Sequence, residues 1–363
     1  MDRFFIWGTG RDAERYWGLF QQMDLEGIEV AGFIDSDQRK CAEPFMEKQV
    51  ISPDQISSLD YDYITIWSAD YEDEIRRQAV HRHGVPEQKI TDIFAPYKQK
   101  LKQRYAGQDS AEILDALEKI TDRQGLDVYA FEPERTEKLQ HEVFYDADAQ
   151  LSYIYFENKK MYLRRSWNNF LEIQGRKYVG DFYAEQDPRS PHRYEAGEAA
   201  VQEGDILVDA GVCEGNFSLH HIDKVKKVYL IECNEEWMEA LQHTFAPYKE
   251  KVVFCNKFLS DTDTEKNIRL DTLVKEPADF IKMDIEGEEI RALEGGRELL
   301  SQSRPMRCAI CSYHRRLDEE KIRKILEENG FSVSASAGYM LYIYDPDVLK
   351  NPELRRGIVR GVK

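Results

Sequence analysis

Residues 207–219 read Leu-Val-Asp-Ala-Gly-Val-Cys-Glu-Gly-Asn-Phe-Ser-Leu, and this stretch decides the fold of the C-terminal half. The apolar residues before Asp209 predict a buried strand that ends at this carboxylate. Gly211 and Gly215 then predict a turn whose backbone amides can approach a ligand. A helix is expected to begin after this turn, near Phe217. A strand, a glycine turn and a helix in this order are typical of a nucleotide-binding unit.

The alternation of strands and helices continues toward the C-terminus. Further strands are predicted at 228–232, 252–255, 280–284 and 306–313, helices at 237–243, 286–300 and 318–329, and a last hairpin between 331–334 and 340–344. Such alternation indicates an α/β fold with a parallel sheet that helices cover on both faces.

Polar residues follow several of these strands. Because ligands of open α/β sheets lie beyond the carboxyl ends of the strands, we expect Asp209 and Glu232 to converge on one cavity. Glu232 lies 21 residues after Gly211, where an acidic side chain can accept hydrogen bonds from both hydroxyls of a ribose. The loop has no Gly-Lys-Ser/Thr triplet and no clustered cations, so the expected ligand contains adenosine without phosphates. S-adenosylmethionine fits that description.

Residues 207–219, 228–234 and 281–296 resemble the FkbM family of class I S-adenosylmethionine-dependent methyltransferases. The resemblance spans residues 195 to 345, and its most specific part is the Lys-x-Asp-x-Glu-Gly-x-Glu block at 282–289. It implies a Rossmann-like methyltransferase sheet and the O-methylation of a hydroxyl on a sugar, a nucleotide-linked sugar or a natural product. Val212 and Cys213 replace the Ala and Asn that usually follow the first glycine of the loop.

The resemblance also implies a set of residues for the cofactor. It places Asp209, Gly211 and Gly215 around the methionine end, Glu232 on the ribose, and Ser260 and Asp261 near the adenine. The expected cofactor-binding set is completed by Glu214, Asn216, Phe217 and Cys233.

Methyl transfer from a sulfonium is an in-line displacement, so positioning contributes most of the acceleration. A hydroxyl acceptor still profits from a base, and His314, at a predicted strand end, is the first candidate. The alternative is a structural His314, and Asp284 is the second candidate base. Lys282 is expected to be buried against a carboxylate. A divalent metal on Asp284, Glu286 and His314 is a further alternative, and we predict none.

The N-terminal residues predict a second, smaller Rossmann-like domain over residues 1–97. Gly8-x-Gly10-x-x-Ala13 follows a strand, and Asp35 lies 25 residues beyond Gly10. This region resembles the small domains that precede some sugar-modifying transferases, which implies a nucleotide or nucleotide-sugar ligand. The alternative is a domain that binds nothing and only docks or dimerises.

Residues 98–195 are expected to form a helical linker and a hairpin cap, and residues 196–363 the methyltransferase domain. The cap contains a basic and aromatic segment. One interpretation is that this segment binds the acceptor. The alternative is a hairpin whose outward faces are charged and bind nothing. The members of the segment are Lys159, Lys160, Arg164, Arg165, Arg176, Lys177, Arg189, His192 and Arg193, interleaved with Tyr153, Tyr155, Tyr162, Trp167, Tyr178 and Tyr183.

The composition limits the partners and the cell compartment. A net charge of −18 disfavours nucleic acid, and no apolar run is long enough for a membrane span, so we expect a small-molecule or glycan acceptor. The start shows no signal-peptide pattern, which predicts a cytoplasmic protein with six free cysteines. Cys308 and Cys311 are interpreted as two buried strand thiols. The additional domain makes a homodimer plausible.

Two other functions compete with methyl transfer. One is a nicotinamide-dependent sugar-nucleotide oxidoreductase that uses Gly8 to Asp35, for which no catalytic Tyr/Lys or Cys pair is evident. The other is a non-catalytic nucleotide-binding scaffold that keeps the fold. Cofactor binding and a methylation assay distinguish the three.

Overall fold

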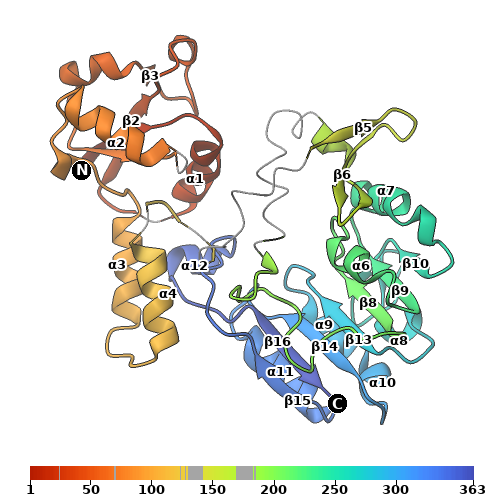
Figure 1. Cartoon of the computed structure of the whole chain (residues 1–363). Coiled ribbons are helices and arrows are strands. Elements are labelled where there is room, and N and C mark those ends of the chain that lie inside the picture. The colour runs from red at the N-terminus through yellow and green to blue at the C-terminus, as the bar shows by residue number, and fades with distance from the viewer. Residues whose placement is uncertain are drawn as a thin grey trace. The chain divides into compact units, whose positions relative to one another are not determined.

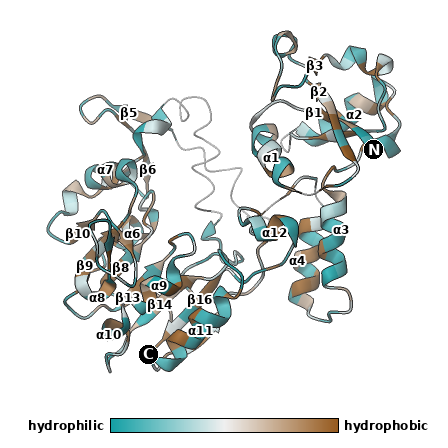
Figure 2. Cartoon of the chain, turned by 180° about the vertical axis from the view of Figure 1, so that it is seen from behind, coloured by the Kyte–Doolittle hydropathy of each residue, from teal (hydrophilic) through white to brown (hydrophobic). Residues whose placement is uncertain are grey.

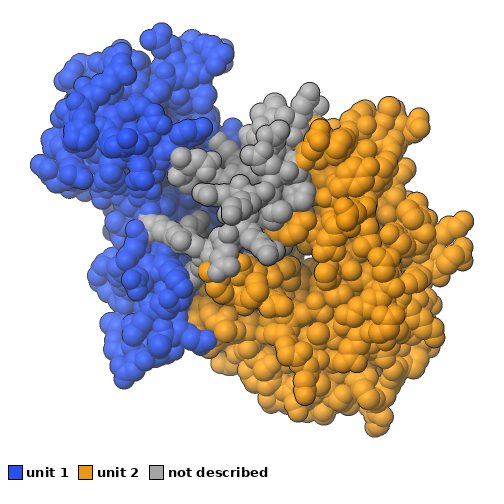
Figure 3. All heavy atoms as spheres, viewed as in Figure 1, with its two compact units in different colours: residues 1–130, 341–354 blue, residues 131–340, 355–363 orange. Residues whose placement is uncertain are grey.

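The computed structural model describes residues 1–363 except 24, 69–70, 123, 127, 130–141, 169–182 and 184. The chain forms two compact units, which Figure 3 distinguishes by colour. Unit 1 comprises Met1–Ala130 and Leu341–Leu354, and unit 2 comprises Phe131–Met340 and Arg355–Lys363. None of the helices among the described residues combines the length and apolar character that a membrane crossing requires.

Unit 2 is built on a seven-stranded sheet with the order β10-β9-β8-β13-β14-β16-β15 (Figure 1). The strands are β8 (Ile206–Ala210), β9 (Lys227–Ile231), β10 (Val252–Cys255), β13 (Phe280–Met283), β14 (Arg307–Cys311), β15 (Ser332–Ala335) and β16 (Ile358–Val362). Pairings from β10 to β14 are parallel, which confirms the predicted α/β fold. The strand order reverses between β8 and β13, and ligands of such sheets bind at this point.

Apolar side chains hold this sheet between helices. The helices are α6 (Asn216–His221), α7 (Glu235–Thr244), α8 (Leu270–Leu273), α9 (Glu289–Glu294), α10 (Arg297–Leu300) and α11 (Asp318–Glu328). On one face, Val208, Ile281 and Ile310 of the strands pack in one buried cluster with Leu293 and Leu326 of the helices. In Figure 2, α11 accordingly carries both apolar and polar residues.

Two predictions for the C-terminal region were wrong. The helix expected at 286–300 is divided into α9 and α10 at Gly295 and Gly296. Gly295 packs so closely on the carbonyl oxygen of Ser260 that a Cβ would lie 2.0 Å from it. The expected hairpin between 331–334 and 340–344 does not form, since β15 pairs instead with β16. A spacing of a few residues favoured the hairpin, whereas the observed partner lies after residues 341–354, which belong to unit 1.

A three-stranded antiparallel sheet precedes the large sheet in unit 2. It consists of β5 (Phe144–Asp146), β6 (Leu151–Phe156) and β7 (Lys159–Tyr162), and it confirms the predicted hairpin. Arg176, Lys177 and Tyr178 of the basic and aromatic segment lie outside the described residues. A short two-stranded sheet, β11 (Phe258–Leu259) with β12 (Asn267–Ile268), follows β10.

Unit 1 contains a four-stranded parallel sheet with the order β3-β2-β1-β4. Its strands are β1 (Asp2–Trp7), β2 (Ile28–Ile34), β3 (Val50–Ile51) and β4 (Tyr63–Ile66), and its helices are α1 (Arg11–Gln22), α2 (Glu72–His81), α3 (Ala95–Arg104) and α4 (Ala111–Thr121). Alternate residues of the strands, among them Phe5, Trp7 and Ile64, form its apolar core.

Residues 341–354 return from the second half of the chain to complete unit 1, and they contain α12 (Pro346–Lys350). The hydroxyl of Tyr97 in α3 donates a hydrogen bond of 2.8 Å to the carbonyl oxygen of Val348. The amide of Leu354 donates to the hydroxyl of Tyr105, also at 2.8 Å. Val348 and Leu349 are buried, so this segment is part of the core of unit 1.

Candidate active site

A cavity of about 650 Å³ opens in unit 2 at the carboxyl ends of β8, β9 and β13. Six residues of the predicted site line it: Gly211, Glu214, Asn216, Glu232, Cys233 and Asp284. They come from the turn after β8, from the end of β9 and from the end of β13. The cavity therefore lies where the strand order reverses.

The glycine turn forms one wall of this cavity and needs its two glycines. Gly211 has φ +72°, and a Cβ there would lie 1.6 Å from the carbonyl oxygen of Asp284. Gly215 has φ +83° and precedes α6, and a Cβ there would meet Leu241 and Phe245. The turn between them can therefore approach both the neighbouring strand end and α7 only with glycine at these positions.

Asp209 does not line the cavity, because it is buried beneath the turn in an ion pair with Lys282. The Nζ of Lys282 lies 3.1 Å from Oδ1 of Asp209, and Ser218 donates a hydrogen bond of 2.6 Å to Oδ2. Lys282 also donates to the carbonyl oxygen of Gly211 at 2.5 Å. Burial would lower the pKa of Lys282, but the charges of Asp209 and Asp284 raise it well above its usual range. The expectation that Lys282 is buried against a carboxylate is confirmed.

Glu232 lines the cavity at the end of β9 and is held by backbone amides. Its Oε2 accepts a hydrogen bond of 3.0 Å from the amide of Cys213, and its Oε1 accepts one of 2.8 Å from the amide of Asn234. The first of these bonds joins the carboxylate to the glycine turn. Glu232 is thus fixed in one orientation at the cavity wall.

Asp284, which directly follows β13, is the centre of a polar cluster in the cavity wall. It accepts hydrogen bonds from the hydroxyls of Tyr194, at 2.8 Å, and of Tyr313, at 3.3 Å. Nε2 of His192 and Nε2 of His314 each lie 3.4 Å from one of its oxygens. Burial would raise the pKa of Asp284, but the hydrogen bond from His192 and the neighbouring cationic groups hold it well below its usual range.

His314 is buried behind Asp284 and is not among the residues that line the cavity. Its Nδ1 lies 3.0 Å from Oε1 of Glu289, whose side chain is also buried. Burial would lower the pKa of His314, but the hydrogen bond and charge of Glu289 raise it to about 9. At neutral pH the imidazole is therefore protonated. A protonated imidazole can donate a hydrogen bond that orients Asp284, but it cannot act as the base.

The remaining predicted residues lie around or beyond the cavity. Phe217 lines a smaller neighbouring cavity of about 210 Å³. Ser260 is buried, and its hydroxyl donates to Asp261, which forms an ion pair of 2.8 Å with Arg291. Neither Ser260 nor Asp261 lines the main cavity. Residues 257–259, directly before them, line it instead.

Several residues that line this cavity were not among the predicted cofactor-binding or catalytic residues. They are His192, Tyr194, Trp237, Lys257, Phe258 and Tyr313. His192 belongs to the basic and aromatic segment that the sequence offered as an acceptor-binding cap, and Tyr194 directly follows that segment. Tyr313 is the last residue of the strand predicted at 306–313, but only the following residue, His314, was given a role.

In unit 1, Asp35 of the N-terminal glycine fingerprint is occupied by local contacts. Its Oδ2 accepts hydrogen bonds from the hydroxyl of Thr9, at 2.5 Å, and from the amide of Thr9, at 3.2 Å. Lys40 forms an ion pair of 3.1 Å with the same oxygen. These contacts close the glycine turn onto β2.

Comparison with protein families places these sites in context. Residues 106–333 match the model of the methyltransferase FkbM domain, which is more than half of the chain. The chain belongs to the FkbM methyltransferase family. The expected resemblance is thereby confirmed, and the family supports methyl transfer as the reaction. Residues 1–91 match a second model, described as C2185-like, N-terminal.

A solved structure with a TM-score above 0.5 shows that the fold is that of an FkbM methyltransferase. A crystal structure of methyltransferase FkbM from Methylobacillus flagellatus KT is 18% identical, with a TM-score of 0.55, and the match covers 100% of this chain and 90% of that one. A magnesium protoporphyrin IX methyltransferase from Synechocystis PCC 6803 with bound SAM is 20% identical, with a TM-score of 0.31, over 44% of this chain and 71% of that one. No curated protein sequence matches this FkbM methyltransferase.

Proposed function

We propose that this chain transfers the methyl group of S-adenosylmethionine to a hydroxyl of a sugar, a nucleotide-linked sugar or a natural product. The observation that carries the proposal is that Glu232 and Asp284 line one cavity, at the ends of the two strands that flank β8 and its glycine turn. Glu232, after β9, can accept hydrogen bonds from ribose hydroxyls. Asp284, after β13, would face the reacting centre.

The charge of the cavity supports a cationic cofactor over a phosphorylated one. Its described lining contains two lysines, Lys257 and Lys282, and the second is paired with Asp209. The same lining holds six carboxylates: Glu185, Glu214, Glu232, Asp284, Glu286 and Glu288. A negative field of this kind attracts a sulfonium cation and repels phosphates.

The residues of the cavity fit the parts of S-adenosylmethionine. Glu232 would bind the ribose, while the amides of the turn from Gly211 to Asn216 would hold the methionine end. Phe258 and Leu259 would contact the adenine, since they line the cavity where Ser260 and Asp261 do not. Phe258 is 52% exposed, which leaves its ring free to stack on a base.

Asp284 would accept the proton of the reacting hydroxyl. As the oxygen attacks, the new bond joins it to the methyl carbon, the bond from sulfur to methyl breaks, and its electron pair stays on sulfur. The proton passes to Asp284, which remains ionised until that step. His314 and Tyr194 would orient the carboxylate through the contacts described above.

Ligand binding and methyl transfer test this proposal. Calorimetry should show binding of S-adenosylmethionine and S-adenosylhomocysteine, and methyl-labelled cofactor should transfer label to hydroxylated acceptors. Tight binding of a nicotinamide dinucleotide without binding of S-adenosylmethionine would support the oxidoreductase instead. Cofactor binding without transfer to any glycan or natural-product hydroxyl would support the scaffold.

For residues 1–97 we retain the proposal of a nucleotide or nucleotide-sugar ligand. Calorimetry with nucleotides and nucleotide-sugars tests it.

A further inference from the structure

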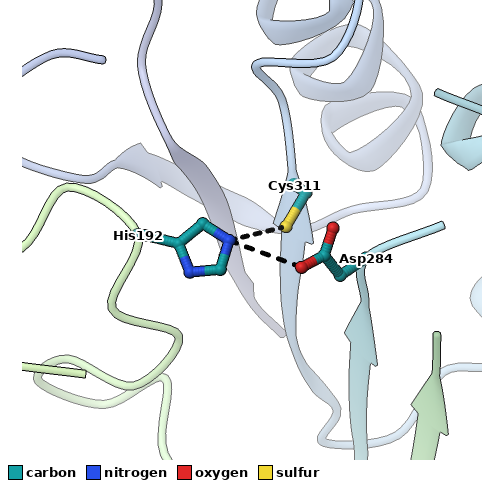
Figure 4. A group of neighbouring side chains, drawn as sticks. All are labelled: His192, Asp284 and Cys311. Atoms are coloured by element: carbon teal, nitrogen blue, oxygen red, sulfur yellow. Dashed lines mark hydrogen bonds and ion pairs between the residues drawn. The ribbon is translucent and has the colours of Figure 1, made fainter. Parts of the chain in front are cut away.

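Three side chains of different chemistry meet beside the cavity: His192, Asp284 and Cys311 (Figure 4). Nε2 of His192 lies 3.4 Å from Oδ2 of Asp284 and 3.9 Å from Sγ of Cys311. The three ligand atoms all lie within 4.8 Å of one another. His192 and Cys311 are buried, and His192 and Asp284 line the cavity.

The fold brings these residues together from three separate places. Cys311 is the last residue of β14, and Asp284 directly follows the neighbouring strand β13. His192 lies in the segment before β8. Because two of the positions are fixed by adjacent paired strands, the spacing of their side chains is set by the sheet.

We propose that His192, Asp284 and Cys311 bind one divalent transition-metal ion, with zinc the best match, and leave one coordination position open to the cavity. Donor atoms around a tetrahedral zinc ion lie about 3.3–3.8 Å apart, close to the observed spacing. A set of one nitrogen, one oxygen and one sulfur donor excludes magnesium and calcium, which take oxygen ligands. Three protein ligands with an open fourth position are typical of catalytic zinc.

The charges around the three ligands are compatible with a bound cation. The two nearby cationic side chains have carboxylates of their own, since Lys282 pairs with Asp209 at 3.1 Å and His314 with Glu289 at 3.0 Å. Binding would release the thiol proton of Cys311, and the thiolate with Asp284 would balance the two positive charges of the metal. The other carboxylates of the cavity add to the attraction.

A second group, Asp284, Glu289 and His314, also brings three ligand atoms together. This second group is the weaker candidate for a metal site, because Glu289 and His314 do not line the cavity. Oε1 of Glu289 also accepts a hydrogen bond of 2.9 Å from the amide of Ile285, which gives it a structural role at the start of α9. A metal there would lie behind Asp284, away from an acceptor.

This inference rests on the proposed function, because the open position would take the oxygen of the acceptor hydroxyl. A bound zinc ion polarises such an oxygen and lowers the pKa of the hydroxyl. With Oδ2 of Asp284 on the metal, Oδ1 would accept the proton of this more acidic hydroxyl. A weakly basic carboxylate can do so more readily than it could with a free hydroxyl.

Metal titration of the full-length protein tests the site. After treatment with a chelator, the protein should bind one equivalent of Zn²⁺ in competition with a chromogenic chelator. Co²⁺ in its place should give the near-ultraviolet absorption of a thiolate–cobalt bond. Cys311→Ser and His192→Ala should each weaken Zn²⁺ binding at least about 100-fold. Cys308→Ser is the matched control, since Cys308 is equally buried on β14 but belongs to the cluster on the opposite face.

Several outcomes would overturn the inference. Zn²⁺ that does not bind at micromolar concentration, or that binds equally well to Cys311→Ser and His192→Ala, is one of them. A Co²⁺ complex of the unchanged protein without the thiolate absorption is another, and it does not depend on how any variant folds. Full methyl transfer by metal-free protein would remove the metal from the reaction and leave the proposed function intact. Failure of both metal-free and zinc-loaded protein to bind S-adenosylmethionine would overturn the proposed function and with it the catalytic role given to the metal.

Discussion

Lys282 and Asp209 are register partners on the parallel strands β13 and β8, and their side chains form a buried ion pair of 3.1 Å. The same ammonium group donates a hydrogen bond to the carbonyl oxygen of Gly211. One cation therefore links the centre of the sheet to the turn that forms the cavity wall. A buried ion pair often adds little to the free energy of unfolding when compared with two apolar side chains. Removing only one partner is strongly destabilising, because the other charge is left buried and unpaired.

Lys282→Met should destabilise unit 2, because it leaves Asp209 buried without its cation. We expect a loss of about 3–5 kcal/mol in the free energy of unfolding, measured by chemical denaturation. Adding Asp209→Asn should restore part of the loss, since the uncompensated charge is then gone. A single variant as stable as the natural protein would show that the pair does not hold the turn.

Gly211→Ala should abolish binding of S-adenosylmethionine. The added Cβ would lie 1.6 Å from the carbonyl oxygen of Asp284, so the turn must move. Gly204→Ala is the matched control, because Gly204 also has a positive φ, of +81°, but no atom lies within 4 Å of its Cβ. The control should lose only about 1–2 kcal/mol of stability and keep its affinity. Calorimetry and denaturation separate the two effects, and equal affinity of both variants would contradict the argument.

Glu232→Gln should weaken S-adenosylmethionine binding by about tenfold or more, because hydrogen bonds to a charged group contribute about 1.5–3 kcal/mol. Glu235→Gln, an exposed acid in the first turn of α7, should leave the affinity unchanged. Isothermal calorimetry gives both dissociation constants. If the two variants bind alike, the ribose does not lie against Glu232.

Asp284→Asn should lower kcat by about 10²–10⁴-fold and leave the affinity for S-adenosylmethionine nearly unchanged, since the proposed role of this carboxylate is to accept a proton. Glu294→Gln on α9, an exposed position, serves as the control. The measurement is initial rate at saturating cofactor together with calorimetry. A loss of cofactor affinity with unchanged kcat would assign Asp284 to binding.

Asp318 should make stability depend on pH. Burial raises its pKa to about 6 from an ordinary value of 3.8, so the folded state binds this proton more tightly than the unfolded state. Its contribution is therefore greatest below the unfolded pKa and is lost as the pH rises through about 6. Relative to Asp318→Asn, the natural protein should lose up to about 3 kcal/mol between about pH 4 and pH 7.5. Parallel pH profiles of the two proteins in urea denaturation would contradict the shift.

The sequence allowed the glycine turn and the acidic strand ends to be located because these signals are local. A run of apolar residues followed by Asp209 or Glu232 indicates a strand and its end without knowledge of the partners. The sequence could not show that Asp209 lies beneath the turn, because Lys282, which holds it there, is more than 70 residues away. Pairing across parallel strands depends on the strand order, which local patterns do not contain.

The other differences also come from contacts between distant segments. His192 reaches the cavity from a part of the chain with no clear periodicity, so the sequence placed it only in the candidate acceptor-binding segment and not beside Asp284. Residues 340–344 have strand-like composition, yet residues 341–354 pack in unit 1 and leave β16 to complete the sheet. Ser260 and Asp261 follow residues 257–259, which line the cavity, so the expected adenine segment was displaced along the chain by a few residues.

The return of residues 341–354 to unit 1 constrains the order of folding during synthesis. A nascent chain that has released only the first 130 residues lacks Val348 and Leu349, whose side chains are buried in the finished unit. Although this unit contains the first residues of the sequence, it can be completed only after residues 341–354 have left the ribosome. Until then its unfinished apolar surface is available to chaperones or to neighbouring nascent chains.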